Sequence, residues 1–328
     1  MQNCLIFGLG GIGSFYGSLI YRSGKARLSA AARSNYRTVK EKGVSITSPM
    51  FGDYHVQFED VYNTSNPNSQ SGSPKQFDYV VVATKALPNA TPALPTLLEP
   101  FITPKLTTIA LIQNGVGIED QVAERWPENT IITCVAWASA MQVESGVIEH
   151  KDNASITLGL FENERVDTEI AQKRLRSFSN LLISGGGDVD VQENMQTARW
   201  KKVVWNSAWN ALTTLSDLDT YAYLTSSPSA PATARAAMHE VITVAQALGL
   251  PIPFTLVEEL MDRVGDRRIN SSMQMDCRHK RPMEIEVILG TPLRKAKEHG
   301  IAVPVLETLY TLLTAIDKRN AELRSSKA

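Results

Sequence analysis

The sequence predicts an α/β domain built on a doubly wound parallel sheet, followed by an all-helical domain. In the first half, short apolar runs alternate with helical stretches. The run from Phe77 to Ala83 is apolar on both faces, which is typical of a buried parallel strand. After about residue 190 the pattern is almost entirely helical. We therefore expect domains at residues 1–192 and 193–328.

Each expected element of the first half follows from its own apolar pattern. The first apolar run ends at a glycine, and a helical stretch over residues 12–21 follows it. Strands separated by helices predict βαβ units and hence a parallel sheet. The remaining strands are expected at 27–32, 77–83, 107–112 and 130–136. Residues 63–74 are rich in Ser, Asn and Pro, so we expect a solvated surface loop there.

The second half predicts helices that end at recognisable stop signals. Gly249 and Gly300 each follow a helical stretch, and a proline follows each glycine by a few residues. The helices are expected at 198–215, 232–248, 254–264, 284–299 and 305–323.

Charge and composition exclude several classes of function. The 328 residues include 33 Lys and Arg against 34 Asp and Glu, so no basic excess indicates nucleic-acid binding. Glycines interrupt the apolar run from Leu5 to Ile20, which predicts no membrane span. The N-terminal residues lack the pattern of a secretory signal, so we expect a cytoplasmic protein.

Cysteine and histidine spacings predict neither a disulfide framework nor a metal site. The three cysteines are Cys4, Cys134 and Cys277, which lie far apart and form no CxxC pair. The five histidines show no HxH or HExxH spacing.

A glycine-rich turn follows the first predicted strand and opens the first helix. Its members are Gly8, Gly10, Gly11, Ile12 and Gly13. In such a GxGxxG turn the glycines permit a tight turn, close approach of a pyrophosphate and close packing of helix on strand. The anion then lies at the helix N-terminus. This context predicts a dinucleotide site.

The ends of later strands indicate which dinucleotide binds and where. The second strand ends at Arg33 rather than at an acidic residue, and a guanidinium suits a 2′-phosphate, so NADP(H) is favoured over NAD(H). A solvated surface arginine is the alternative reading. Lys85 and Asn114 follow two further strands, where ligands of a doubly wound sheet bind.

The first helix of the second half carries an unusual polar stripe. Lys202, Asn206 and Asn210 lie four residues apart and share one face of a helix that is otherwise rich in Val and Trp. Buried amines and amides need partners, and three aligned ones favour a functional pocket over isolated core polar groups.

With these motifs in order along nearly the whole chain, the sequence resembles the ketopantoate reductase (2-dehydropantoate 2-reductase) family. The motifs that carry the resemblance are GLGGIG at 8–13, ATKA at 83–86, QNGVG at 113–117, WKKVVWNSAWNALTTL at 200–215, SSMQMD at 271–276, EIEVILG at 284–290 and HGIAVP at 299–304. The resemblance implies an N-terminal Rossmann domain and a C-terminal helical domain like that of 6-phosphogluconate dehydrogenase.

The resemblance also implies roles for individual residues. Lys202 matches the catalytic lysine and Glu284 the active-site glutamate. The positions implied to contact substrate are Asn114, Asn206, Asn210 and Ser272. Lys85 and Asn114 match cofactor contacts, and Arg33 matches the residue that binds the 2′-phosphate. Asn270 does not align with the family's asparagine upstream of the paired serines.

The function implied is NADPH-dependent reduction of 2-dehydropantoate to pantoate, in pantothenate biosynthesis. In this reaction a lysine ammonium would protonate the ketone oxygen as hydride reaches C2. The implied partner is a small 2-oxo acid, and a homodimer is left open. Two alternatives stand beside this one: a reductase of another 2-oxo acid on the same scaffold, and a non-catalytic NADP(H)-binding sensor.

Overall fold

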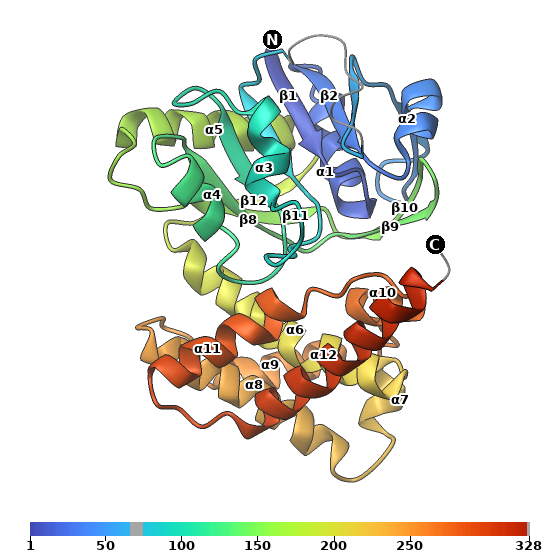
Figure 1. Ribbon diagram of the computed structural model, residues 1–328, viewed down its shortest axis with the longest axis vertical. Coiled ribbons are helices and arrows are strands. Elements are labelled where there is room, and N and C mark those ends of the chain that lie inside the picture. Colours follow the sequence, from blue (N-terminus) through green and yellow to red (C-terminus); the bar gives the residue numbers. More distant parts are fainter. Residues whose placement is uncertain (66–74, 327–328) are drawn as a thin grey trace. The chain divides into compact units, whose positions relative to one another are not determined.

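The computed structural model describes residues 1–65 and 75–326, which divide into two compact units (Figure 1). The first, here called the α/β unit, comprises the described parts of residues 1–85, 89–113 and 118–195. The second, here called the helical unit, comprises residues 196–326 together with two short segments, 86–88 and 114–117. Those two segments follow strands of the α/β unit in sequence but pack with the helical unit.

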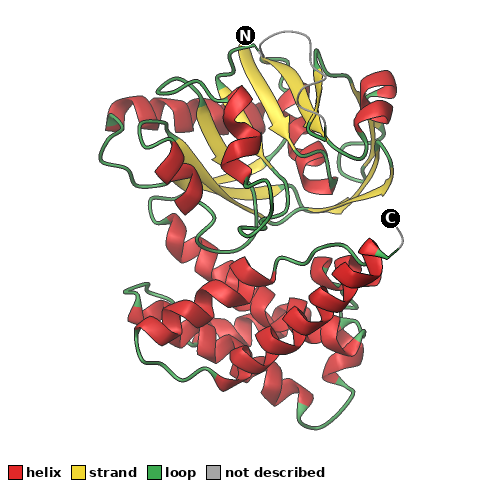
Figure 2. Ribbon diagram, viewed as in Figure 1, coloured by secondary structure: helices red, strands yellow, loops and turns green. Residues whose placement is uncertain are grey.

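The described part of the α/β unit contains an eight-stranded sheet in the order β12-β11-β8-β7-β6-β1-β2-β5. Strands are yellow and helices red in Figure 2. All neighbouring pairs are parallel except β11 and β8. The strands are β1 (Gln2–Phe7), β2 (Ala26–Ala32), β5 (Val61–Asn63), β6 (Tyr79–Val82), β7 (Thr108–Leu111), β8 (Ile131–Ala136), β11 (Ser155–Leu160) and β12 (Asp188–Val191). The central strands are buried throughout, as their continuous apolar runs require.

Strand β1 lies at the point where the order of the sheet reverses. The chain passes from β1 to β2 on one side, and later strands build outward from β6 on the other. In open α/β sheets, ligands bind beyond the carboxyl ends of the strands at such a switch point. The glycine-rich turn leaves β1 at this end.

Helix α1 (Gly11–Arg22) packs between the main sheet and a second, four-stranded sheet of order β4-β3-β10-β9. The sequence pattern does not indicate this small sheet, because its strands are short and half-polar. They are β3 (Val44–Thr47), β4 (Tyr54–Val56), β9 (Ser139–Glu144) and β10 (Val147–Asp152). The unit's other helices are α2 (Tyr36–Lys42), α3 (Leu94–Leu98), a 3-10 turn at Glu99–Phe101, α4 (Asp120–Arg125) and α5 (Thr168–Ser184).

The helical unit begins within α6 (Met195–Ser216), a long helix whose centre is buried. The others are α7 (Thr220–Leu224), α8 (Ala230–Ala247), α9 (Thr255–Val264), α10 (Ser272–Arg278), the π-helical turn η3 (Glu286–Gly290), α11 (Thr291–Glu298) and α12 (Pro304–Ser325). Helix α8 packs against α9, α11 and α12. Gly249 and Gly300 both adopt the positive φ expected of a glycine that ends a helix.

The predicted fold class is confirmed: a parallel-sheet α/β domain precedes a helical one. The helix expected over residues 284–299 is interrupted by the π-helical turn, which the periodicity did not indicate. Of the expected loop at 63–74, Asn63 ends β5, and residues 66–74 lie outside the described residues. Over the described part of the chain, no helix has both the length and the apolar character needed to cross a bilayer.

Candidate active site

The glycine-rich turn is shaped by three close approaches within the α/β unit. Gly8 has a φ of 101°, and a Cβ there would lie 2.7 Å from Thr84 Cγ2. A Cβ on Gly13 would lie 2.0 Å from the carbonyl oxygen of Gly8, and one on Gly11 would lie 2.2 Å from that of Ala140. The turn is therefore packed on its inner side so tightly that only glycine fits.

Gly10 differs from its neighbours, because a Cβ there would meet no atom within 4 Å. Gly10 is the N-cap of α1, whose first turn carries no acidic side chain. The first backbone N–H groups of a helix have no acceptor inside the helix, and its dipole favours an anion there. These features fit a pyrophosphate resting on Gly10 against the start of α1.

This difference between the glycines predicts two distinct phenotypes. Gly10→Ala should fold with an unchanged melting temperature but bind a dinucleotide roughly 10- to 100-fold more weakly, because overpacking costs about 1–3 kcal/mol. Gly13→Ala should instead lower the melting temperature, since its Cβ overlaps the backbone. Differential scanning fluorimetry and a cofactor titration separate the two outcomes. Equal affinity in Gly10→Ala and wild type would contradict a cofactor at this turn.

Arg33 and Asn35 follow the end of β2. Arg33 is exposed, as a residue that reads a ligand's phosphate must be before binding. Asn35 is buried, and its Nδ2 donates to the carbonyl oxygen of Leu9 at 2.7 Å and to Gln142 Oε1 at 2.9 Å. Asn35 thus ties the segment that carries Arg33 to the glycine-rich turn. Sequence reasoning missed it, although it lies only two residues after Arg33.

The carboxyl ends of β6 and β7 are joined by side-chain contacts. Gln113 Nε2 donates to the carbonyl oxygen of Thr84 at 3.1 Å and to Thr84 Oγ1 at 3.2 Å. Lys85 follows directly and is partly buried. Gly8, Thr84 and Gln113 therefore bring the ends of three adjacent strands together at the switch point.

In the helical unit, Lys202 and Glu284 are joined through Asn114. Lys202 Nζ donates to Asn114 Oδ1 at 2.8 Å, and Asn114 Nδ2 donates to Glu284 Oε2 at 3.2 Å. The other carboxylate oxygen of Glu284 accepts from the backbone N–H of Ala86 at 2.8 Å. Three segments far apart in sequence thus converge on one buried carboxylate, which is 9% exposed.

The environment of Lys202 lowers the pKa of its amine toward neutral pH. Burial lowers the pKa of Lys202 from 10.5 to about 8, since a charged amine loses hydration there. The Glu284 carboxylate opposes this shift, and the Arg199 guanidinium adds to it. An amine with a pKa near the working pH can both hold and release a proton, which is what a general acid requires.

The other predicted substrate contacts differ in their burial. Asn206 and Asn210 are buried on α6, at 5% and 4% exposure, and Asn206 Nδ2 has no hydrogen-bond partner among the described residues. A buried amide donor without an acceptor fits a site completed by a ligand. Ser272 is exposed at the start of α10. Its neighbour Ser271 is the buried N-cap and accepts from Gln274 N and Thr213 Oγ1.

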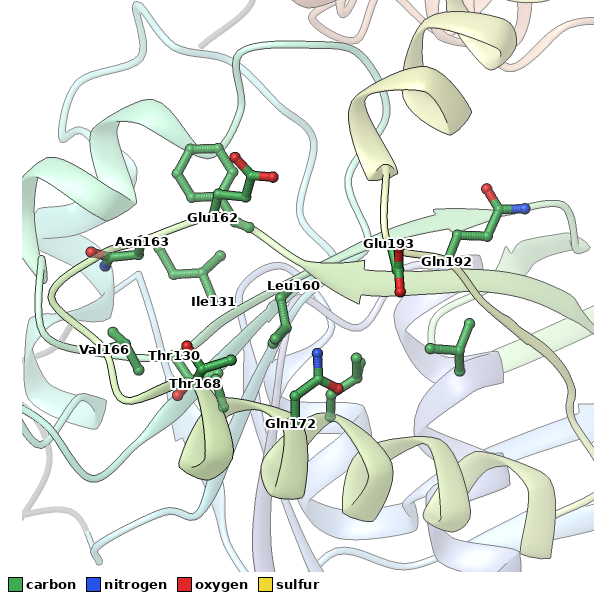
Figure 3. A pocket seen from close by; sticks show the side chains of 14 residues that line it. Thr130, Ile131, Leu160, Glu162, Asn163, Val166, Thr168, Gln172, Gln192 and Glu193 are labelled. Atoms are coloured by element: carbon green, nitrogen blue, oxygen red, sulfur yellow. The ribbon is translucent and has the colours of Figure 1, made fainter.

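The α/β unit also holds a cavity of about 450 Å³ (Figure 3). Labelled side chains around it include Thr168 and Gln172 of α5 and Gln192 and Glu193, which follow β12. None of the predicted site residues lines this cavity. Among the described residues, no cluster of His, Cys, Asp or Glu side chains is arranged to hold a metal ion.

A glycine-rich turn at the switch point of a parallel sheet, together with a helical unit that presents a partly dehydrated lysine, defines the class of nicotinamide-dependent oxidoreductases. Comparison with known proteins narrows the class. The family model described as ketopantoate reductase PanE/ApbA matches residues 4–163, and its C-terminal counterpart matches residues 194–317.

Individual relatives cover almost the whole chain. A 2-dehydropantoate 2-reductase of Nostoc sp. is 31% identical over 317 residues, covering 96% of this chain and 95% of its own length. The crystal structure of 2-dehydropantoate 2-reductase from Methylococcus capsulatus is 32% identical, with a TM-score of 0.82 over 97% of both chains. A D-mandelate dehydrogenase structure with NADH and anilino(oxo)acetate shares the fold at a TM-score of 0.83 with 20% identity. This chain belongs to the ketopantoate reductase family.

Proposed function

We propose that this protein reduces 2-dehydropantoate to pantoate with NADPH, and that Lys202 is the proton donor. The observation that carries the proposal is the partly buried network of Lys202, Asn114 and Glu284, in which the lysine has a pKa of about 8. Relatives of similar length, from Nostoc and Methylococcus, bear the name 2-dehydropantoate 2-reductase.

The residues of the network divide the chemical work among them. The dihydronicotinamide, when bound, supplies hydride to C2 of the substrate. Lys202 stabilises the negative charge that develops on the ketone oxygen and transfers its proton there. Asn114 orients the ammonium by accepting from it at Oδ1, and Glu284 fixes the amide of Asn114 by accepting from Asn114 Nδ2. Asn206 offers an amide donor, without a partner in the part of the chain that the structure describes, that would bind an acceptor oxygen of the substrate.

The preference for NADPH over NADH is assigned to Arg33. We expect Arg33→Ala to raise the KM for NADPH about tenfold or more, since a charge-assisted hydrogen bond contributes about 1.5–3 kcal/mol. The KM for NADH should change little, because NADH lacks the 2′-phosphate. Steady-state kinetics with both cofactors measure the ratio. Arg37→Ala, an exposed arginine of α2, is the matched control.

A second candidate function is reduction of a different 2-oxo acid by the same chemistry. Its support is that the fold is shared with the D-mandelate dehydrogenase structure, so the scaffold accommodates more than one substrate. The network around Lys202 acts on the 2-oxo group and leaves the rest of the substrate unspecified.

A substrate panel distinguishes the two candidates. Purified protein is assayed for NADPH oxidation with 2-dehydropantoate, with 2-oxoisovalerate, which lacks the hydroxymethyl group, and with phenylglyoxylate. The highest kcat/KM with 2-dehydropantoate supports the proposal. A higher value with another 2-oxo acid supports the second candidate. Oxidation of NADPH with none of them contradicts both.

A further inference from the structure

Asn114 belongs to a short loop, residues 114–117, that is held on one side by a buried arginine. Arg199 lies on α6 three residues before Lys202, so the two share a helix face. It is 2% exposed, and its Nη1 donates to the carbonyl oxygen of Gly115 at 3.1 Å. Arg199 therefore contacts the residue that follows Asn114, while Lys202, three residues further along the helix, contacts Asn114 itself.

On its other side the loop is held by the π-helical turn η3. Within this turn the N–H of Thr291 bonds to the carbonyl oxygen of Glu286, five residues back. The next bond in that register would come from residue 292, which is Pro292 and has no N–H. The carbonyl oxygen of Val287 instead accepts from the backbone N–H of Val116 at 3.0 Å.

The loop and the turn approach so closely that only glycine fits between them. Gly115 has a φ of 90°, and a Cβ there would lie 2.4 Å from the Cβ of Val287. Residues 115 and 116 are thus fixed from opposite sides, by Arg199 and by Val287.

We propose that Arg199 and the π-helical turn form a two-sided clamp on residues 114–117 that positions Asn114 against Lys202. Arg199 is a positioning residue in this scheme, since it acts on the reaction through Asn114. The catalytic consequence of the clamp rests on the proposed function, but the clamp itself does not.

The charge of Arg199 gives the clamp a second effect on the same lysine. The charged groups that act on Lys202 are Glu284, which favours the ammonium, and Arg199, which disfavours it. Removing the Arg199 charge should therefore raise the pKa of Lys202, whereas loosening the loop without changing charge should not.

Four variants separate these effects: Arg199→Met, Arg199→Gln, Arg199→Lys and Pro292→Ala. The first two remove the charge, the third keeps it, and the fourth supplies an N–H that competes with Val116 for the carbonyl oxygen of Val287. Two readouts need no turnover. They are the pKa of Lys202 from an NMR titration of ¹³C-lysine, assigned with Lys202→Met, and the hydrogen-exchange rate of the Val116 amide.

In Arg199→Met we expect a raised Lys202 pKa. The Val116 amide should exchange about tenfold faster, because one hydrogen bond that holds the loop is lost. The kcat should fall by about 10- to 100-fold, because Asn114 is misplaced. Arg199→Gln should raise the pKa as well. Arg199→Lys should keep the pKa near the wild-type value, and Pro292→Ala should speed Val116 exchange without raising that pKa.

Wild-type exchange and an unchanged Lys202 pKa in folded Arg199→Met would overturn the proposal. If Arg199→Met does not fold, Pro292→Ala serves as the test, and unchanged exchange of the Val116 amide in that variant overturns the proposal. A wild-type protein that reduces no 2-oxo acid, yet shows these shifts in its variants, would contradict the proposed function and leave the clamp standing.

Discussion

Replacing Lys202 with methionine should lower kcat by about 10²- to 10⁴-fold, the contribution expected of a general acid. Methionine nearly matches the length of the lysine stem but cannot donate a proton or stabilise a developing oxyanion. The Kd for NADPH should remain at its wild-type value. Single-turnover absorbance at the nicotinamide band measures the chemical step, and a fluorescence titration measures the Kd.

The adjacent lysine provides the matched control for this experiment. Lys201 is exposed, and its side chain takes no part in the network of Lys202, Asn114 and Glu284. Lys201→Met should therefore retain wild-type kcat. A Lys202→Met variant with unimpaired kcat, or one that loses NADPH binding to the same extent, would remove the lysine from the role of proton donor.

The pH dependence of the wild-type enzyme follows from the same lysine. A general acid acts in its protonated form, so kcat should be highest below the pKa of Lys202 and fall as pH rises through about 8. A rate profile between pH 6 and 10 measures the midpoint. A kcat that rises through this range would indicate that the lysine acts as a base in the measured direction.

Much of the fold could be predicted from the sequence, because its main elements are long and strongly patterned. The continuous apolar run at 77–83 became the buried central strand β6, and the helical stretch at 198–215 became α6. The four-stranded sheet escaped prediction, since strands such as β9 have no continuous apolar face. The interruption at η3 also escaped, because a π-helical turn keeps helical composition while shifting the hydrogen-bond register.

The candidate site could be predicted residue by residue but not as a network. The spacing of Lys202 and Asn206 indicated one helix face, and Asn114 was expected at the end of a strand. Periodicity carries no information on which distant segments meet, so the contacts of Glu284 with Asn114 and with the backbone of Ala86 required coordinates. Arg199 could have been noticed, because a cation three residues before Lys202 shares its helix face.

Glu284→Gln should lower kcat by about 10- to 100-fold, the range for disrupting a buried charged hydrogen bond worth about 1.5–3 kcal/mol. The hydrogen bonds that Glu284 accepts include one from Ala86 N and one from Asn114 Nδ2. A glutamine has only one amide oxygen, so its NH₂ must face one of these donors. If the side-chain amide of Asn114 rotates so that its oxygen accepts from the glutamine NH₂, its own NH₂ faces Lys202. An NH₂ group cannot accept a hydrogen bond from the ammonium of Lys202.

The charge change in Glu284→Gln gives this prediction a second, independent readout. The carboxylate raises the pKa of Lys202, so its removal should move the alkaline limb of the kcat profile to lower pH. Glu298→Gln, which removes an exposed carboxylate paired with Lys295, should leave the limb in place. A limb that moves to higher pH in Glu284→Gln would contradict the assignment.

Arg199→Met should move the same limb in the opposite direction, because it removes a positive neighbour rather than a negative one. The double variant Glu284→Gln/Arg199→Met should therefore have a midpoint between those of the two single variants. Its kcat at the pH optimum should nevertheless stay low, since both changes loosen the hold on Asn114. This separation between a restored pKa and an unrestored rate distinguishes electrostatic tuning of Lys202 from its positioning.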